Sequence, residues 1–283
     1  MRIALINSGL GLLAVAAELN RLRPDADLIL APDPDGMPWG PRTPADIAAR
    51  SVMCARAAVA HQPDVLVMAC NTGSVHALDA LRAEFEPGIA VIGTVPAIKP
   101  AAAAHHRVAI WATVATTNSD YQRRLIARFG GSAEVTPIAC PGLADAVDAG
   151  EDEEIDAAVA LAAARTPAGC EAIVLGCTEY ELVADRIGRA VPGAVTLGSA
   201  AAVAAQALRR VPADRSATPS APGRPNPSLA ATASQTRGGS GSVRVLLSGR
   251  PSGLPPAGLK YAEGRLLAPL VLVPGEKAAT VPA

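Results

Sequence analysis

The chain has few aromatic residues, few lysines and no long hydrophobic run. Phe, Tyr and Trp make up 2% of its 283 residues, although half of all residues are hydrophobic. The core must therefore be built mainly from alanine and aliphatic side chains. Because no apolar run approaches the roughly 20 residues that cross a bilayer, we expect no membrane span. The apolar segment at 3–6 is too short for the hydrophobic part of a secretory signal peptide.

Charge and cysteine usage exclude further classes of protein. The 25 basic and 26 acidic side chains give a net charge of −1, and no block of like charge predicts a nucleic-acid partner. The five cysteines are odd in number and contain no CxxC pair. We therefore expect free thiols in a reducing cytoplasm rather than a disulfide framework.

The sequence signatures of bound cofactors are also missing. No group of His, Cys, Asp and Glu has the spacing of zinc ligands. Gly9 and Gly11 follow an expected strand but lack the third glycine of a dinucleotide-binding turn. Lys99 alone gives thin support for a pyridoxal phosphate enzyme. We therefore expect neither a metal nor an organic cofactor.

What the chain does contain is a regular alternation of short apolar runs and longer Ala-rich amphipathic stretches. This rhythm is typical of parallel sheets with helices on both faces. The expected strands cover residues 2–6, 27–31, 64–69, 89–93, 107–112, 133–138, 171–176 and 194–197. The expected helices cover residues 11–22, 44–61, 73–85, 96–104, 118–129, 142–149, 152–164, 179–190 and 199–210.

The chain also resembles itself. Residues 2–6 match residues 107–111, and residues 64–70 match residues 171–177 at nearly the same separation. Two matches in register indicate duplicated α/β halves. Each of the longer segments ends in a cysteine at the carboxyl edge of its strand, where open α/β sheets bind ligands.

We therefore predict an α/β fold with two similar, doubly wound parallel-sheet halves and the active site between them. The first half covers residues 1–95, with 198–211 returning to it. The second half covers residues 96–197.

A low-complexity C-terminal tail is predicted for residues 212–283. Residues 212–242 are rich in Pro, Ser, Ala, Gly and Thr, a composition typical of flexible segments. The apolar stretches at 243–248 and 266–273 could form a small hairpin within 243–273 or pack on the body of the protein.

The first candidate site begins with Cys70, which ends an expected strand. Asn71, Thr72 and Gly73 open the next helix, and backbone N–H groups at a helix start favour an anion and lower the pKa of a nearby thiol. Cys177 occupies the equivalent place in the second half. Either cysteine alone could simply fill a small gap in the core. Their equivalent positions favour a shared chemical role.

Two thiols on opposite sides of a cleft suit the inversion of a carbon centre. One thiolate removes the carbon-bound proton from one face, and the opposite thiol delivers a proton to the other face. No cofactor is required if the pocket stabilises the carbanion electrostatically.

Several motifs in the correct order make residues 1–210 resemble the aspartate/glutamate racemase superfamily, and glutamate racemase in particular. These motifs are Asn7-Ser8-Gly9, Pro38-Trp39-Gly40, Ala69-Cys70-Asn71-Thr72, Val91-Ile92-Gly93 with Pro96-Ala97, Thr113 through Thr116 to Ser119, Ala139-Cys140-Pro141, and Leu175-Gly176-Cys177-Thr178.

The resemblance implies a cofactor-independent amino-acid racemase that interconverts L- and D-glutamate. Its product would supply peptidoglycan synthesis and so maintain the cell wall and cell shape. The resemblance implies that Cys70 and Cys177 are the catalytic acid and base, assisted by Asn7 and Glu179. The implied substrate-binding residues are Asn7, Ser8, Trp39, Gly40, Asn71, Thr72, Thr113, Thr116, Thr178 and Glu179. We expect an acidic amino acid as the bound small molecule, a homodimer as one assembly, and no nucleic-acid or membrane partner.

Two residues depart from the family pattern, which usually has Asp at position 7 and His at position 179. Asn7 can form hydrogen bonds but cannot take a proton, and Glu179 should raise the pKa of Cys177. We therefore expect weak activity at pH 7, which the double change Asn7→Asp with Glu179→His would increase. Cys140 is expected to be a packing residue.

Two alternatives stay open because of these departures. One is a related two-cysteine racemase or isomerase with another substrate, such as aspartate or a hydantoin. The other is a weakly catalytic, racemase-like protein that binds a ligand or a partner protein.

Overall fold

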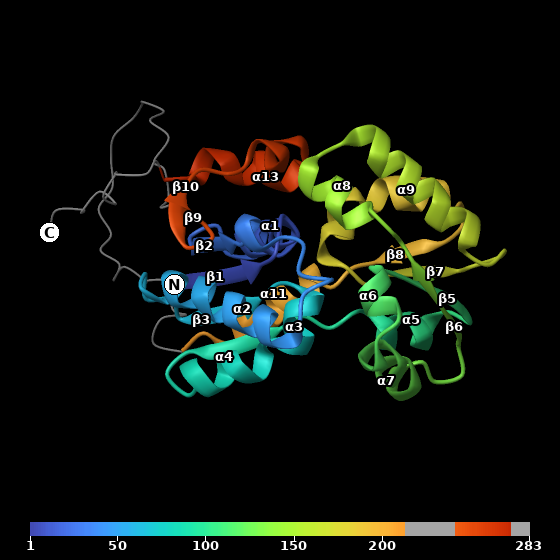
Figure 1. Cartoon of the computed structure of the whole chain (residues 1–283), viewed down its shortest axis with the longest axis horizontal. Helices are drawn as coiled ribbons and strands as arrows, with labels where there is room; N and C mark the ends of the chain where they lie inside the picture. The colour runs from blue at the N-terminus through green and yellow to red at the C-terminus, as the bar shows by residue number, and fades with distance from the viewer. Residues whose placement is uncertain (213–240, 273–283) are drawn as a thin grey trace, which may run out of the picture.

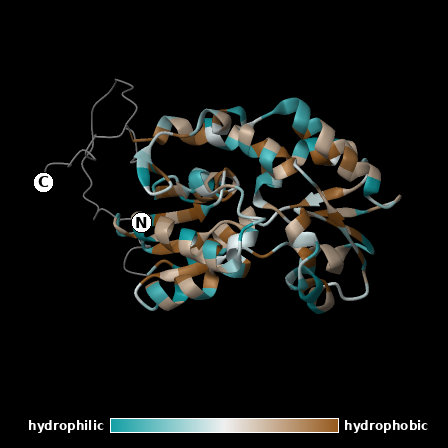
Figure 2. Ribbon diagram, viewed as in Figure 1, coloured by the Kyte–Doolittle hydropathy of each residue, from teal (hydrophilic) through white to brown (hydrophobic). Residues whose placement is uncertain are grey.

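The chain folds around two β-sheets that lie side by side, each flanked by helices (Figure 1). The structure, a computed structural model, describes residues 1–212 and 241–272. Strands are mostly apolar and the outer faces of many helices are hydrophilic (Figure 2), as the alternating pattern of the sequence predicts. Within the described residues, none of the helices combines the length and the apolar character needed to cross a membrane.

The first sheet has six strands in the order β10-β9-β2-β1-β3-β4. Neighbouring strands run parallel except β10, which is antiparallel to β9. The strands are β1 (Arg2–Asn7), β2 (Asp27–Pro32), β3 (Val65–Met68), β4 (Ala90–Gly93), β9 (Val243–Leu247) and β10 (Arg250–Ser252).

The second sheet has four parallel strands in the order β6-β5-β7-β8. The strands are β5 (Arg107–Ala112), β6 (Glu134–Ala139), β7 (Ala172–Leu175) and β8 (Val195–Leu197). This order repeats β2-β1-β3-β4 of the first sheet, so β3 and β7 are equivalent strands. The predicted fold of two similar parallel-sheet halves is confirmed.

Most of the helices lie within or close to the ranges expected from the apolar periodicity of the sequence. The α-helices are α1 (Leu12–Leu22), α2 (Pro44–Val59), α3 (Asn71–His76), α4 (Leu78–Phe85), α5 (Ile98–Ala104), α6 (Val114–Thr117), α7 (Asp120–Phe129), α8 (Leu143–Ala149), α9 (Asp152–Arg165), α10 (Ala184–Ala190), α11 (Ala200–Arg210) and α13 (Ala262–Leu267). The 3-10 helices are η1 (Pro34–Gly36), η2 (Thr178–Val183), η3 (Pro256–Lys260) and η4 (Ala268–Leu270).

Two expected helices differ where they approach the cysteines. The helix expected at 73–85 starts two residues earlier and divides at Ala77 into α3 and α4. It starts early because the Cys70 side chain accepts a hydrogen bond from the Gly73 N–H and caps the helix. The helix expected at 179–190 begins as the tighter η2. Both departures place backbone N–H groups beside a cysteine.

One apolar cluster extends from the first sheet into the second. It includes Leu5 of β1, Leu13 of α1, and Trp111 and Leu175 of the second sheet, all almost completely buried. Helix α11 crosses back from the second sheet and packs against α1, β3 and β4. The interface between the sheets is therefore a packed core, and a site at this interface rests on rigid elements.

The C-terminal segment, defined as residues 241–272, packs on the first sheet. Strand β9 extends the sheet beside β2, and α13 packs against α1. Strand β9 forms a hairpin with β10, and the stretch 266–273 meets β9 at a parallel bridge between Val271 and Val243. Residues of that stretch up to 270 lie in α13 and η4. The prediction of a flexible segment at 212–242 falls almost entirely on 213–240, which lie outside the described residues.

Candidate active site

A cavity of about 390 Å³ lies where the carboxyl ends of the two sheets meet. Residues one or two positions beyond the ends of five strands line it, namely Ser8, Cys70, Thr113, Cys140 and Cys177. Nine of the predicted site residues line this cavity: Ser8, Trp39, Gly40, Cys70, Asn71, Thr72, Thr113, Cys177 and Glu179. The parallel topology brings these sequence-distant residues together because the carboxyl ends of parallel strands share one edge.

Cys70 is held at the start of α3 with its sulfur close to two donors. The Gly73 N–H lies 3.4 Å from the sulfur, and the Ser8 hydroxyl lies 3.9 Å from it. Burial and the charge of Glu179 raise the pKa of the Cys70 thiol to about 12, although both donors oppose the shift. Cys70 is therefore a thiol at neutral pH, beside donors that can stabilise a transient thiolate.

Cys177 is paired with a carboxylate. Its thiol donates a hydrogen bond to Glu179 Oε2 at 2.8 Å. Burial, then the Glu179 charge, raises the pKa of Cys177 well above its usual range. Glu179 is 2% exposed, and its Oε1 is a buried acceptor without a hydrogen-bond partner in the described part of the chain. A carboxylate in contact with a thiol can accept the thiol proton.

Asp148 reaches the cavity from α8. Its Oδ1 accepts a hydrogen bond from the Leu10 N–H at 2.7 Å. Burial and the nearby Glu179 charge raise the pKa of Asp148 well above its usual range. A protonated Asp148 is a hydrogen-bond donor on the cavity wall.

Asn7 does not line the cavity; it is completely buried behind it. Its Nδ2 donates to the Ala69 carbonyl at 2.7 Å and lies 3.2 Å from the Thr178 hydroxyl. Its Oδ1 accepts from the Ser8 hydroxyl and the Gly9 N–H. These contacts join the loops after β1, β3 and β7, so Asn7 connects residues of both halves.

Two further predicted site residues, Thr178 and Thr116, lie outside the cavity lining, and Asn71 of the lining also bonds to the second half. Thr178 lies behind the cavity in contact with Asn7, and its hydroxyl is 3.3 Å from Glu179 Oε2. The hydroxyl of Thr116 lies 3.1 Å from that of Thr113, outside the cavity lining. Asn71 donates to the Gly176 carbonyl at 2.9 Å, while its buried Oδ1 has no hydrogen-bond partner among the described residues.

Two glycines after β1 lie close to the site, and the sequence does not reveal why these positions require glycine. A Cβ at Gly9 would lie 2.2 Å from Asp148 Oδ1, and one at Gly11 would lie 2.4 Å from the Thr178 hydroxyl. These glycines allow residues of the second half to approach β1 closely. The nearby carboxyl and hydroxyl groups lie far away in the sequence, so no local pattern reveals the contacts. Cys140, expected only to pack, also lines the cavity.

The cavity carries acidic groups. Asp145, Asp148 and Glu179 line it, whereas none of the described residues that line it is Lys, Arg or His. In the described part of the chain, no group of three or more His, Cys, Asp or Glu residues could hold a metal ion. The available donors to an anionic ligand are hydroxyl, amide and backbone groups.

Comparison with known proteins supports the same assignment. The family model described as Asp/Glu/Hydantoin racemase matches residues 6–208. Glutamate racemase from Herpetosiphon aurantiacus is 38% identical over 216 residues, which cover 73% of this chain and 83% of that protein. Glutamate racemase from a Roseiflexus species is 36% identical, over 69% of this chain and 73% of that protein.

A solved structure has the same arrangement of elements. The Escherichia coli glutamate racemase in complex with L-glutamate and the activator UDP-MurNAc-ala superposes with a TM-score of 0.72 at 25% identity, covering 92% of this chain and 91% of that one. These similarities confirm the resemblance that the motifs indicated. The chain belongs to the Asp/Glu/Hydantoin racemase family.

Proposed function

We propose that this chain interconverts L- and D-glutamate without a cofactor and supplies D-glutamate for peptidoglycan synthesis. One observation carries the proposal. Cys70 and Cys177 follow equivalent strands of the two sheets and line the same cavity. This arrangement is what two-sided proton transfer at one carbon requires. Relatives that are more than 30% identical are named glutamate racemases.

The two cysteines have different surroundings, which suggests how one reaction direction begins. Cys177 passes its proton to Glu179 and becomes the thiolate that removes the substrate Cα proton. Cys70 keeps its proton because its pKa is about 12, and it delivers that proton to the opposite face. The step leaves a Cys177 thiol, a protonated Glu179 and a Cys70 thiolate, which the Gly73 N–H stabilises. This state is also the one that starts the reverse reaction.

Unpaired polar atoms at the cavity provide places for the substrate. Buried acceptors normally have partners, so Asn71 Oδ1 and Glu179 Oε1 favour a ligand that donates hydrogen bonds. The ammonium group of an amino acid fits that chemistry. The hydroxyls of Ser8, Thr72 and Thr113 and a protonated Asp148 can donate to the substrate carboxylates.

A second candidate follows from the charge of the cavity. Three carboxyl side chains, with no cation among the described lining residues, disfavour a substrate that carries two carboxylates unless Asp148 stays protonated. A racemase of the same two-cysteine type acting on a less negative substrate, such as a hydantoin, fits this charge. Racemisation of L-glutamate, L-aspartate and a chiral hydantoin by the purified protein, followed by circular dichroism, distinguishes the candidates. Fastest loss of signal with glutamate supports the first proposal, and no reaction with glutamate contradicts it.

The expected location and assembly belong to the same proposal. Synthesis of a cell-wall precursor implies a cytoplasmic protein. The homodimer expected from the sequence is tested by sedimentation equilibrium of the full chain, where a mass near twice 28.6 kDa would support it.

A further inference from the structure

The C-terminal segment reaches toward the active site through the turn between β9 and β10. This turn consists of Ser248 and Gly249, whose φ angles of 46° and 82° are both in the left-handed region. Glycine adopts such angles freely, whereas serine does so at a cost. A serine kept in this conformation needs a compensating contact.

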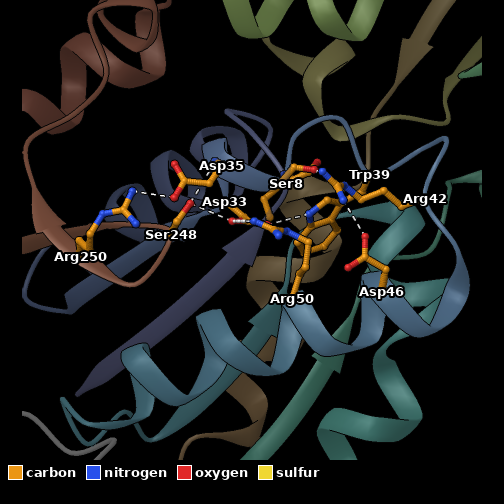
Figure 3. Close-up of polar contacts among 11 residues, drawn as sticks. Ser8, Asp33, Asp35, Trp39, Arg42, Asp46, Arg50, Ser248 and Arg250 are labelled. Atoms are coloured by element: carbon orange, nitrogen blue, oxygen red, sulfur yellow. Dashed lines mark hydrogen bonds and ion pairs between the residues drawn. The ribbon is translucent and has the colours of Figure 1, made fainter.

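That contact is a buried carboxylate. Ser248 Oγ lies 2.8 Å from Asp33 Oδ1 and also accepts a hydrogen bond from the Asp35 N–H (Figure 3). The Ser248 N–H donates to the Pro32 carbonyl at 2.9 Å, which fixes the turn against the end of β2. Asp33 is completely buried, so each hydrogen bond that it accepts offsets part of the free-energy cost of burying its carboxylate.

Asp33 in turn binds Trp39, which forms part of the cavity wall. The indole N–H of Trp39 donates to Asp33 Oδ2 at 3.1 Å, and the Arg50 guanidinium binds both carboxylate oxygens (Figure 3). Burial alone would raise the pKa of Asp33, but the bonds from Arg50, Ser248 and Trp39 outweigh it and keep the pKa below its usual range. Asp33 is therefore an ionised group shared by the C-terminal turn and the Trp39 loop.

We propose that Ser248 is a positioning residue of the active site, which orients Asp33 and thereby fixes Trp39 and Gly40 in the cavity wall. Trp39 is 1% exposed and lines the cavity with Gly40. The family match ends at residue 208, so this contribution comes from a segment outside it. The effect on substrate affinity rests on the proposed function, whereas the effect on the Trp39 loop does not.

The test compares Ser248→Gly with Ser248→Ala. Glycine removes the hydroxyl and suits the left-handed backbone, whereas alanine removes the hydroxyl and keeps the backbone cost. We expect both to raise KM for L-glutamate about fivefold, the effect of one weakened hydrogen bond, with a smaller change in kcat. Both should also speed hydrogen exchange in residues 33–42, as measured by mass spectrometry, because the loop loses a buried anchor.

A spectroscopic measurement follows Trp39 itself. In a Trp111→Phe background Trp39 is the only tryptophan. Loss of the Ser248 hydroxyl should then shift its emission to the red and increase quenching by acrylamide. This measurement and the hydrogen exchange require no substrate, so they decide the proposal even if the protein fails to racemise glutamate.

Ser242→Ala is the matched control. The Ser242 hydroxyl donates to Asp27 Oδ1 at 2.7 Å, a similar bond between the C-terminal segment and the first sheet at the opposite end of β9. We expect Ser242→Ala to leave KM, exchange at 33–42 and Trp39 emission unchanged. The proposal is overturned if Ser248→Gly leaves the Trp39 loop as in the wild type. It is equally overturned if Ser242→Ala changes that loop as much, or if only Ser248→Ala has an effect.

Discussion

Glu179 has two opposing effects on Cys177. Its charge raises the pKa of the thiol and so disfavours the thiolate. Its Oε2 also lies 2.8 Å from the sulfur and can receive the thiol proton. The sequence identified Glu179 as unusual but could not decide between these effects, because only the side-chain geometry shows that the two groups touch.

The change Glu179→Gln separates the two effects. If Glu179 is the proton acceptor, the variant should be about tenfold slower at pH 7, the lower range for a positioned base. Removal of the charge lowers the pKa of Cys177, so the difference from wild type should shrink as pH rises. Wild-type activity itself should rise from pH 7 to pH 9, since both thiol pKa values are raised. A pH profile of D-glutamate formation in which the variant is faster at pH 7 would rule out the acceptor role.

Asn7 leads to a different expectation from the one drawn from sequence. The sequence suggested that Asn7→Asp would help Cys70, but the amide of Asn7 donates to the Ala69 carbonyl at 2.7 Å. A carboxylate there would repel that carbonyl oxygen and lose the bond. We expect Asn7→Asp to lower the free energy of unfolding by about 1–3 kcal/mol and to reduce activity.

Chemical denaturation and the racemisation assay measure both effects of Asn7→Asp. The exposed change Asn118→Asp is the control and should alter the free energy of unfolding by less than about 0.5 kcal/mol. If Asn7→Asp instead increased the rate without loss of stability, the connecting role given to Asn7 would be incorrect.

At the scale of elements, the loop between β1 and α1 lies in close contact with residues of the second half. The sequence places Gly9 in the Asn7-Ser8-Gly9 motif and excludes a dinucleotide-binding turn at Gly9 and Gly11, but it assigns Gly11 no role. The structure gives Gly11 a role, because a Cβ there would lie 2.8 Å or less from Thr178, Asn7 and Glu179. Apolar periodicity predicts the strands and helices. It cannot predict the contact between Gly11 and the Thr178–Glu179 loop, because these residues lie about 170 positions apart in the sequence.

Gly11→Ala should therefore displace the loop that carries Glu179. We expect a loss of about 1–3 kcal/mol in unfolding free energy, typical of overpacking, and a large loss of activity. Gly253→Ala is a suitable control because no atom lies within 4 Å of the added Cβ. Thermal unfolding of Gly11→Ala and Gly253→Ala tests this role of Gly11. Equal stability of the two variants would contradict it.

At the scale of the whole molecule, the C-terminal segment contacts both halves. Besides extending the first sheet, it places the Tyr261 hydroxyl 2.5 Å from the Val147 carbonyl and Lys260 Nζ 2.5 Å from the Gly150 carbonyl. Both acceptors lie at the end of α8, the helix that carries Asp148. The sequence indicated only that this segment could form a hairpin or pack on the body, because its partners are distant and its apolar content is modest.

The duplicated architecture itself was readable from the sequence. Matching strands at nearly equal separation predicted that Cys70 and Cys177 would occupy equivalent places, and they line one cavity. The approach of Asp148 and the Ser248–Asp33 contact were not readable, because a single aspartate or serine has no periodic signal. The internal sequence repeat therefore predicts the position of the two cysteines. The contacts that hold the neighbouring residues, such as Asp148 and Asp33, form only in the folded chain.

The most direct test of the account is racemisation of L-glutamate in D₂O by the full chain and by Cys70→Ser and Cys177→Ser. The wild type should form D-glutamate that carries deuterium at Cα, because one thiolate takes up the Cα proton and the opposite thiol, which has exchanged with D₂O, delivers deuterium. Neither single variant should racemise, although one-sided exchange of deuterium into a single enantiomer can persist where one thiol remains. Formation of D-glutamate by either variant at the wild-type rate would contradict the two-thiol mechanism.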